Sequence, residues 1–381
     1  MCQSDHVAQS SQRRGVLTAL LIAVISLPVA FVILTMVQEG IHLLWVELAN
    51  SMSRPALWAM VMVVPTLAGV GVALLRKHGE DGHNPLGGLA SNPLTFRQYL
   101  SVIAAILVTL LGGLVLGPEV ALVSTGAMVG TVLGRRRGDL DEKRAVLIGV
   151  IFAVLALFVG PVLTGNFDVA PNYTFAWVDL FGGLAVAAAT AGVLTAGRLL
   201  SIGIVRLRGG DVPAVWPMAA AGAAIGLIVV GYSASTGNPV SLVLTSGEEQ
   251  VRPMLALGTA SAIALTVAVK WLAYAISMGS GFRGGPYFPA LFVGGGIGGI
   301  AMALAPSLSQ AAPACGLIAA LVYLAHPKLP AAAIAGAVLG GLIGGWQLIP
   351  AAVVAAVVAA LLPEVRLTTD AAGDSTETVL T

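Results

Sequence analysis

Apolar segments long enough to cross or nearly cross a membrane follow one another along almost the whole chain, and they limit the possible folds more than any other feature. The 381 residues are 57% hydrophobic and only 10% charged, with a mean hydropathy of +0.93, which leaves too little polar surface for a soluble globule. We therefore predict an all-α polytopic membrane protein. The segments lie at about 15–37, 55–75, 99–116, 119–134, 145–165, 178–205, 214–232, 255–278, 288–305, 312–325 and 329–362.

Several of these segments are too short to cross a bilayer alone, and the chain contains 47 glycines and 20 prolines. Glycine permits close helix contact, and both residues interrupt helices where protein surrounds the backbone. Short interrupted segments are typical of transporters in which half-helices meet inside the membrane and offer free backbone groups to a ligand. We therefore favour a transport fold with many tilted and broken helices.

Basic residues indicate the orientation of the chain. Arg13 and Arg14 precede the first apolar run, which is long enough to span and lacks a small-residue cleavage pattern, so we interpret it as a retained helix. Basic clusters at 76–77 and 135–144 fall on the same side in one topology, which predicts that both termini are cytoplasmic. The expected parts are a tail at 1–14, a single transmembrane domain at 15–363 and a short, polar, disordered tail at 364–381.

Composition also argues against several classes of ligand. The net charge is +1 and the chain has no long basic run, so we expect no nucleic-acid partner. Cys2 and Cys315 have neither the spacing of metal ligands nor that of a disulfide framework. We predict no metal and no cofactor, with the lipid bilayer as the surrounding medium.

Glu119 is the acidic residue that stands apart. Most other acidic residues lie in tails, loops or segment edges, whereas Glu119 has apolar flanks in LVLGPEVALVSTG, where an ionised carboxylate is costly. Gly117 permits a sharp turn and Pro118 suits a helix start, so Glu119 falls in the first turn, where amide N–H groups favour negative charge. Such a site also accommodates an anion, and protonation or an incoming anion would displace the carboxylate, which makes Glu119 a candidate gate. The alternative is an ordinary glutamate that faces a water-filled vestibule.

A second helix start suited to an anion lies in GSGFRGGPYFPALFVGGG. Its glycines, including Gly284 and Gly285, lead to Pro286 and an apolar helix whose first N–H groups have no intrahelical partner. The rings of Tyr287 and Phe288 are candidates to shield a dehydrated anion. A purely structural turn is the alternative.

Two other features have simpler interpretations. Lys270 lies within an apolar run and either adds positive potential to an anion path or snorkels to an interface. Glycines at i, i+4 spacing predict smooth helix surfaces for close packing. They are Gly126, Gly130 and Gly134, and Gly336, Gly340 and Gly344.

These stretches, in this order, resemble the CLC family of chloride channels and proton-coupled chloride transporters, in particular its small bacterial members, from about residue 15 to 363. LGPEVALVSTGAMVG is similar to the family's GxEGP helix start, although Val120 and Ala121 replace Gly and Pro. The resemblance implies that Glu119 is the gating glutamate. It also implies the family's fold of two inverted halves and a homodimer, for which the glycine surfaces are the one independent hint.

Other stretches imply ligands for the anion. GSGFRGGPYFPALFVGG is similar to the family's GxFxP stretch, and alignment on Pro289 puts Pro286, which has no N–H, where one amide donor would be. The resemblance then assigns that work to Tyr287 and Phe288. GGWQLIP is similar to the stretch with the family's central tyrosine, which implies that Trp346 donates its indole N–H.

The stretch DGHNPLGGL falls where the family has its GSGIP loop. It implies Asn84 or His83 as a further ligand, with a polar turn as the alternative. The family's exchangers also carry an internal glutamate beyond the proline that Pro161 resembles, but here that region reads NFDVAPN, and Asp168 is out of register on a loop. This departure argues against obligatory chloride/proton exchange by the usual route.

We therefore expect transport of a small anion, chloride first, through a CLC-type channel or exchanger. The alternatives with the same fold are a fluoride exporter and an anion/proton antiporter. An intramembrane hydrolase is a remote alternative. The sequence contains no HExxH, and we expect Glu119 to have no acidic partner inside the membrane. A structural scaffold would leave the lone buried carboxylate unexplained.

Overall fold

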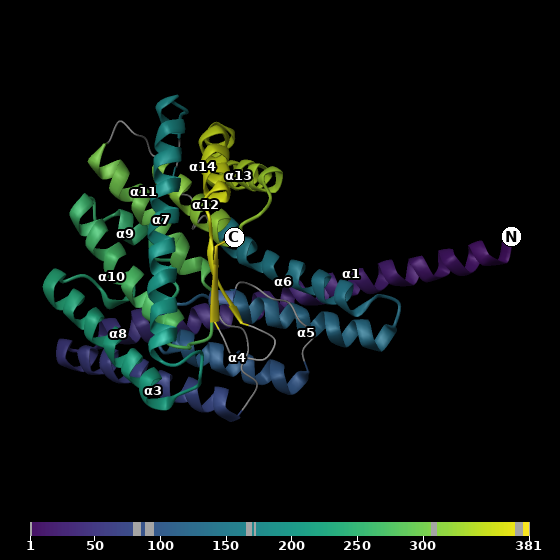
Figure 1. Ribbon diagram of the computed structural model, residues 1–381, viewed down its shortest axis with the longest axis horizontal. Coiled ribbons are helices and arrows are strands. Elements are labelled where there is room, and N and C mark those ends of the chain that lie inside the picture. Colours follow the sequence, from purple (N-terminus) through teal and green to yellow (C-terminus); the bar gives the residue numbers. More distant parts are fainter. Residues whose placement is uncertain are drawn as a thin grey trace.

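Figure 1 shows the computed structural model of the chain as closely packed helices, with a pair of strands near the C-terminus. The structure describes residues 2–78, 85–87, 95–164, 170, 173–305, 311–369 and 376–380. The α-helices are α1 (Cys2–His42), α2 (Ala49–Ser51), α3 (Arg54–His78), α4 (Phe96–Leu111), α5 (Glu119–Arg137), α6 (Glu142–Thr164), α7 (Val178–Leu207), α8 (Val215–Thr236), α9 (Val251–Leu255), α10 (Ala260–Gly279), α11 (Tyr287–Leu304), α12 (Ala311–Ala325), α13 (Leu329–Gly344) and α14 (Ile349–Leu361). The remaining elements are the π-helix η1 (Leu43–Leu48), the 3-10 turns η2 (Pro85–Gly87), η3 (Val240–Leu242) and η4 (Trp346–Leu348), and strands β1 (Val365–Thr369) and β2 (Thr376–Leu380).

The lengths of the helices agree with the mixture of full and partial spans that the sequence predicts. In the described part of the chain, 6 helices are long and apolar enough to cross a membrane, and shorter apolar helices lie among them. The predicted segment at 329–362 is two helices, because the chain turns at Gly345, whose φ is +73°. The boundary expected at residue 14 is not a structural one, since α1 runs unbroken from Cys2.

The helices form two groups that are built in a similar way. In one group α1, α5 and α6 lie side by side, and in the other α7 lies against α11, α12 and α14 (Figure 1). Helices α5 and α11 begin next to each other, and each is followed by a helix that packs back along it. The two helix pairs therefore place two helix N-termini at one point inside the protein.

The glycine surfaces pack within the chain. A Cβ added to Gly126 would overlap the backbone of Gly149 on α6, and one added to Gly294 on α11 would overlap the backbone of Gly316 on α12. Gly336 and its neighbours meet α14 in the same manner. Small residues let helix backbones approach closely. The predicted packing role is therefore confirmed, and these glycines give no independent hint of a homodimer.

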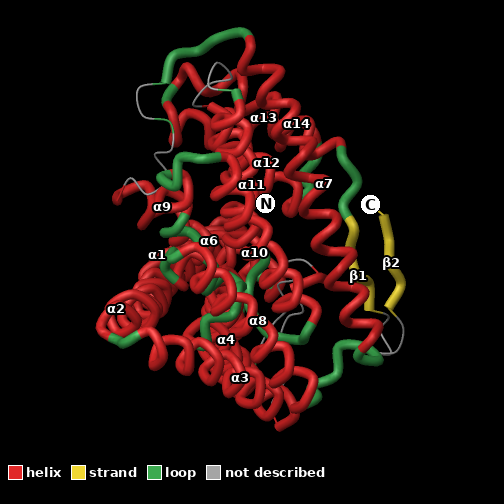
Figure 2. The backbone as a smooth tube through the Cα atoms, turned by 90° about the vertical axis from the view of Figure 1, so that its left-hand side faces the viewer, coloured by secondary structure: helices red, strands yellow, loops and turns green. Residues whose placement is uncertain are grey.

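The end of the chain is folded, so the expectation of a disordered tail is wrong for the described residues. Strands β1 and β2 pair antiparallel, and β1 lies beside α7 (Figure 2). Just before β1, Glu364 forms an ion pair of 3.1 Å with Arg198 of α7, and both side chains are almost fully buried. Arg198 also donates to the carbonyl of Val365 at 2.6 Å and to that of Leu86 at 3.0 Å. The tail sequence alone does not predict this ion pair, because Arg198 lies far from Glu364 in the chain.

Candidate anion site

The site is built where α5 and α11 begin. Pro118 and Pro286 occupy the N-cap positions of the two helices, so neither helix start continues backward as a helix. Gly117 donates to the carbonyl of Gly285 at 2.7 Å, and Gly285 donates to that of Gly117 at 2.6 Å. This pair of hydrogen bonds joins the two helix starts. Their free amides and the positive ends of both helix dipoles therefore point into one small region.

The carboxylate of Glu119 occupies this region. Its side chain is buried, and Oε1 accepts a hydrogen bond of 2.6 Å from the backbone N–H of Phe288. The amide of Tyr287 also acts electrostatically on the carboxylate. Oε2 is buried and accepts no hydrogen bond within the described residues. Glu119 thus uses amides from the partner helix as an anion would.

Two glycines make room for the carboxylate. A Cβ added to Gly285 would overlap Oε2 of Glu119, and one added to Gly117 would overlap both carboxylate oxygens. Neither glycine has a positive φ, so the backbone itself does not require glycine at these positions. The requirement comes from the carboxylate, which fills the space that a side chain would take.

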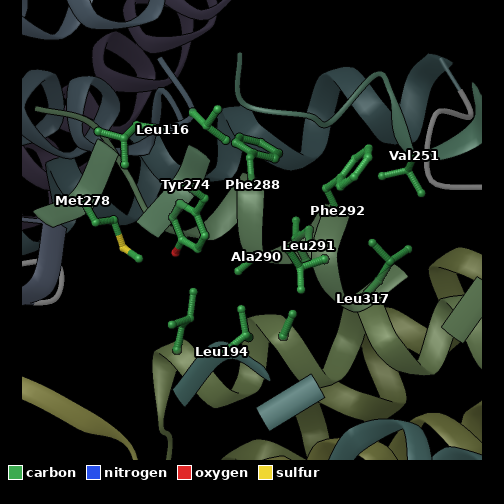
Figure 3. Close-up of a cluster of buried hydrophobic side chains, with 14 of the residues drawn as sticks. Leu116, Leu194, Val251, Tyr274, Met278, Phe288, Ala290, Leu291, Phe292 and Leu317 are labelled. Atoms are coloured by element: carbon green, nitrogen blue, oxygen red, sulfur yellow. The ribbon is translucent and has the colours of Figure 1, made fainter. Parts of the chain in front are cut away.

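An apolar wall encloses one side of the site. Figure 3 shows Phe288 and Phe292 of α11 in the same buried cluster as Tyr274 of α10. Tyr274 points its hydroxyl at the loop before α11 and donates to the carbonyl of Pro286 at 2.7 Å. Exclusion of water strengthens every electrostatic interaction here and makes a charge costly unless amides or a counter-charge stabilise it.

The structure brings together most of the residues that the sequence selected. Glu119, Gly117, Gly285 and the Phe288 amide are in direct contact, and Gly284 lies against Leu116 beside them. The other selected residues of these two helix starts, Pro118, Pro286, Tyr287 and Pro289, lie within one turn of the contact. The two helix starts that the sequence selected separately therefore lie together.

One selected residue, Trp346, is not part of this group. Trp346 begins the turn η4 between α13 and α14, and its side chain is 78% exposed, so nothing in its placement supports a hydrogen bond into the buried site. His83 and Asn84 lie outside the described residues, as does Asp168.

Two charged residues near the site were missed or left undecided. Lys270 does not snorkel; its side chain is fully buried, and Nζ donates to backbone carbonyls. Glu248 is buried as well, and its charge acts on Glu119. The run TSGEEQ, which contains Glu248, was the one sequence signal for this second carboxylate, but such a run is also typical of an ordinary polar loop.

Comparison with known proteins identifies the family. A family model described as "Voltage gated chloride channel" matches residues 142–364, which is more than half of the chain. The chain belongs to this CLC family. Membership confirms that it is a multi-pass membrane protein of a family that transports small anions, as the sequence predicts. The matched residues include α11 but begin after Glu119, so this match does not extend to that residue.

Full-length relatives and solved structures extend the match. The chain is 26% identical to "Putative ion-transport protein YfeO" of Escherichia coli, and to that of Shigella boydii, over 91% of this chain and 89% of each relative. A slow cyanobacterial Cl⁻/H⁺ antiporter has the same fold, with a TM-score of 0.71 at 15% identity over 91% of this chain and 93% of that one. A CLC-type fluoride/proton antiporter matches with a TM-score of 0.64 at 17% identity over 92% and 94%. These likenesses confirm the predicted fold class.

Proposed function

We propose that the chain moves chloride across the membrane along a path that the Glu119 carboxylate closes. The observation that carries this proposal is the position of the carboxylate, which lies between two helix N-termini and accepts the Phe288 amide at 2.6 Å. A carboxylate oxygen there stands where a transported anion would lie. When Glu119 leaves, the same amides are available to chloride.

The close packing around the Glu119 carboxylate supports a gate in which only this side chain moves. Gly117 and Gly285 leave only enough room for the carboxylate, while the backbone around it is tied by two hydrogen bonds. Displacement of the carboxylate therefore vacates a preformed anion site without repacking of the helices. Protonation of Glu119, or competition by an anion, favours this displacement, since a neutral carboxyl group gains less from the amides and dipoles.

The geometry favours transport over hydrolysis. Glu119 accepts its hydrogen bond from a backbone amide, and no serine, threonine or cysteine side chain among the described residues donates to it. A hydrolase would need a nucleophile or a bound water held by a base in this position.

Ion flux from proteoliposomes tests the function. Vesicles loaded with chloride or fluoride would contain wild type, Glu119→Gln or the control Glu47→Gln, whose glutamate is exposed on η1, and internal pH would be recorded. We expect chloride efflux from wild type and the control, and efflux from Glu119→Gln that no longer varies with pH. If wild type moves neither anion, the proposal fails. Movement of fluoride without chloride would assign the fluoride alternative.

We further infer that two copies associate through α13 and η4. Ile334, Val338 and Leu342 are exposed and recur at every fourth residue of α13, so they form one apolar stripe that no described residue covers, and Trp346 of η4 is exposed just after it. Val338→Trp should shift dimers toward monomers in single-molecule photobleaching counts from dilute bilayers. Leu265→Trp, on an exposed face of α10, is the control. Equal counts for both variants would mean that lipid alone covers the stripe.

A further inference from the structure

A buried loop links the anion site to the end of α1. Residues 245–250 connect the η3 turn to α9, and the N–H of Thr245 donates to the carbonyl of Gly113, just before α5, at 3.1 Å. Thr245 and Gly247 both have positive φ, at 67° and 99°, so the loop follows a tight path. The loop is therefore held against the same segment that leads into Glu119.

Glu248 places a second buried carboxylate in this loop. Its side chain is 8% exposed, Oε1 accepts a hydrogen bond of 3.4 Å from Gln38 of α1, and Oε2 is buried with no hydrogen-bond partner within the described residues. Glu119 has the same arrangement, with one oxygen bonded and the other without a partner. A buried carboxylate oxygen in a dry region is expensive to leave unsatisfied, which calls for an explanation in each case.

Lys270 supplies the positive charge beside this loop. Its Nζ donates to the carbonyls of Leu242, Val243 and Leu244 at 3.3, 3.0 and 3.1 Å, and it lies 4.7 Å from the centre of the Phe292 ring. A Cβ on Gly247, next to Glu248, would lie only 2.6 Å from Cε of Lys270. The ammonium is thus fixed by three carbonyls and cannot follow a moving carboxylate.

The charge of Glu248 acts electrostatically on both of the other two charges, those of Glu119 and Lys270. Phe292, which contacts Lys270, lies one turn beyond Phe288, whose amide binds Glu119. Two carboxylates and one ammonium in an enclosed region are neutral together when the carboxylates share one proton, and like charges in such a pair disfavour ionisation of both.

We propose that Glu248 is a second proton-carrying carboxylate of the transport path, which exchanges a proton with Glu119 while Lys270 balances the charge of the pair. In the exchange, protonated Glu248 and ionised Glu119 become ionised Glu248 and protonated Glu119. The O–H bond at one carboxyl breaks as the other forms, and no net charge enters the site. Protonation then releases Glu119 from the amides and opens the site to chloride, so this inference rests on the proposed function.

Titratable groups toward the end of α1 complete the route. Glu249 keeps part of its surface exposed. Partial burial of its carboxyl and the charge of Glu248 raise its pKa, which His42 lowers and Glu39 raises further. The exposed mouth of the loop is therefore acidic, which favours protons over anions. The loop offers protons a route to Glu119 in a sequence that lacks the internal glutamate of the family's exchangers.

The test separates proton movement from chloride movement in proteoliposomes that contain the full chain. We expect coupled proton flux to fall about 100-fold in Glu248→Gln, the lower end of what removal of a positioned proton-transfer group causes. Chloride flux should stay within about twofold of wild type, because an incoming anion also displaces Glu119 directly. The control is Glu47→Gln, whose exposed glutamate lies on η1 outside the loop, and it should retain coupling. Glu248→Asp, which keeps a carboxyl group, should restore part of it and serves if the amide variant does not fold.

The outcomes distinguish this inference from the proposed function. Absence of chloride flux from wild type rejects the transport proposal itself. Chloride flux with full proton coupling in Glu248→Gln, or an equal loss of coupling in the control Glu47→Gln, overturns the role of Glu248. Wild type that moves chloride with no protons at any pH also overturns it, and leaves Glu119 as a gate opened by anions alone.

Lys270 is a positioning residue in this scheme, and its readout is a pH profile. Lys270→Met removes the charge that favours ionised Glu248, so coupled flux should reach its maximum at higher pH than in wild type. Lys270→Arg, which keeps the charge, should restore the original profile. A merely structural role for Lys270 would lower flux equally at every pH.

Discussion

At the scale of single residues, the site depends on the space that Gly117 and Gly285 leave for the Glu119 carboxylate. Gly285 is not among the glycines with positive φ, so alanine is compatible with its backbone, and the nearest atoms that an added Cβ would meet belong to the side chain of Glu119. A methyl group at this position therefore tests the region that the carboxylate occupies. Gly117 is less suitable, since it lies immediately before the helix-starting proline.

Gly285→Ala should lower chloride flux about tenfold, the effect of a binding free energy changed by about 1.4 kcal/mol, because the added methyl group would overlap the position of Glu119 Oε2, where the transported anion would lie. The same change on a Glu119→Ala background should lower flux to a similar extent, because the methyl group still fills the anion position when the carboxylate is gone. Gly192→Ala on α7, where a Cβ meets nothing within 4 Å, is the control. Flux through all variants would be measured in chloride-loaded vesicles. Unchanged flux on both backgrounds would contradict the placement of the anion site between the two helix starts.

At the scale of elements, close backbone contact holds each helix pair in place. Gly126 of α5 meets Gly149 of α6, and the two other glycines of its surface meet Ala145. Because α5 carries Glu119 at its first residue, the angle between α5 and α6 sets where the carboxylate lies. The buried ion pair of Arg198 and Glu364 likewise holds the C-terminal segment against α7.

Gly126→Ala should destabilise the protein by about 1–3 kcal/mol, since the added carbon overpacks a backbone contact. Gly203→Ala on α7, which meets nothing within 4 Å, should leave stability unchanged or slightly raised because alanine favours helix. Thermal unfolding in detergent measures both. Equal midpoints for the two variants would show that α5 and α6 separate freely.

Arg198→Met should lower stability by about 3–5 kcal/mol, because it leaves Glu364 as an uncompensated buried charge. The double variant Arg198→Met/Glu364→Leu should recover much of that loss, since no charge then stays unpaired. Limited proteolysis after Leu361, followed by mass spectrometry, reports whether β1 has left α7. Additive losses in the double variant would contradict a direct pair.

At the scale of the whole molecule, α1 links two opposite regions. Thr18 contacts Asp139 just beyond α5, and Gln38 contacts Glu248. Between Thr18 and Gln38 the helix rises about 30 Å, close to the thickness of the hydrocarbon core. The basic cluster at 135–137 and the acidic loop at 248–249 therefore belong on opposite faces of the membrane.

Single cysteines at Arg136 and Glu249, both exposed positions, should react with a membrane-impermeant maleimide from opposite sides. The expected side for Arg136→Cys is the cytoplasm, since short cytoplasmic loops collect arginine and lysine. Glu249→Cys should react in intact cells. The background would carry Cys2→Ser and Cys315→Ala. Labelling of both cysteines from one side would contradict this topology.

The sequence alone determined the features that depend on neighbouring residues. Apolar length placed the chain in a membrane, and Gly-Pro-Glu predicted a helix start with a carboxylate in its first turn, because these preferences act within one turn. Only the tertiary structure brought Gly285 and Phe288 to Glu119, buried Lys270, and placed Glu248 beside both charges. Those outcomes depend on which distant segments share a dry region, where a charge is retained only beside the partners that stabilise it.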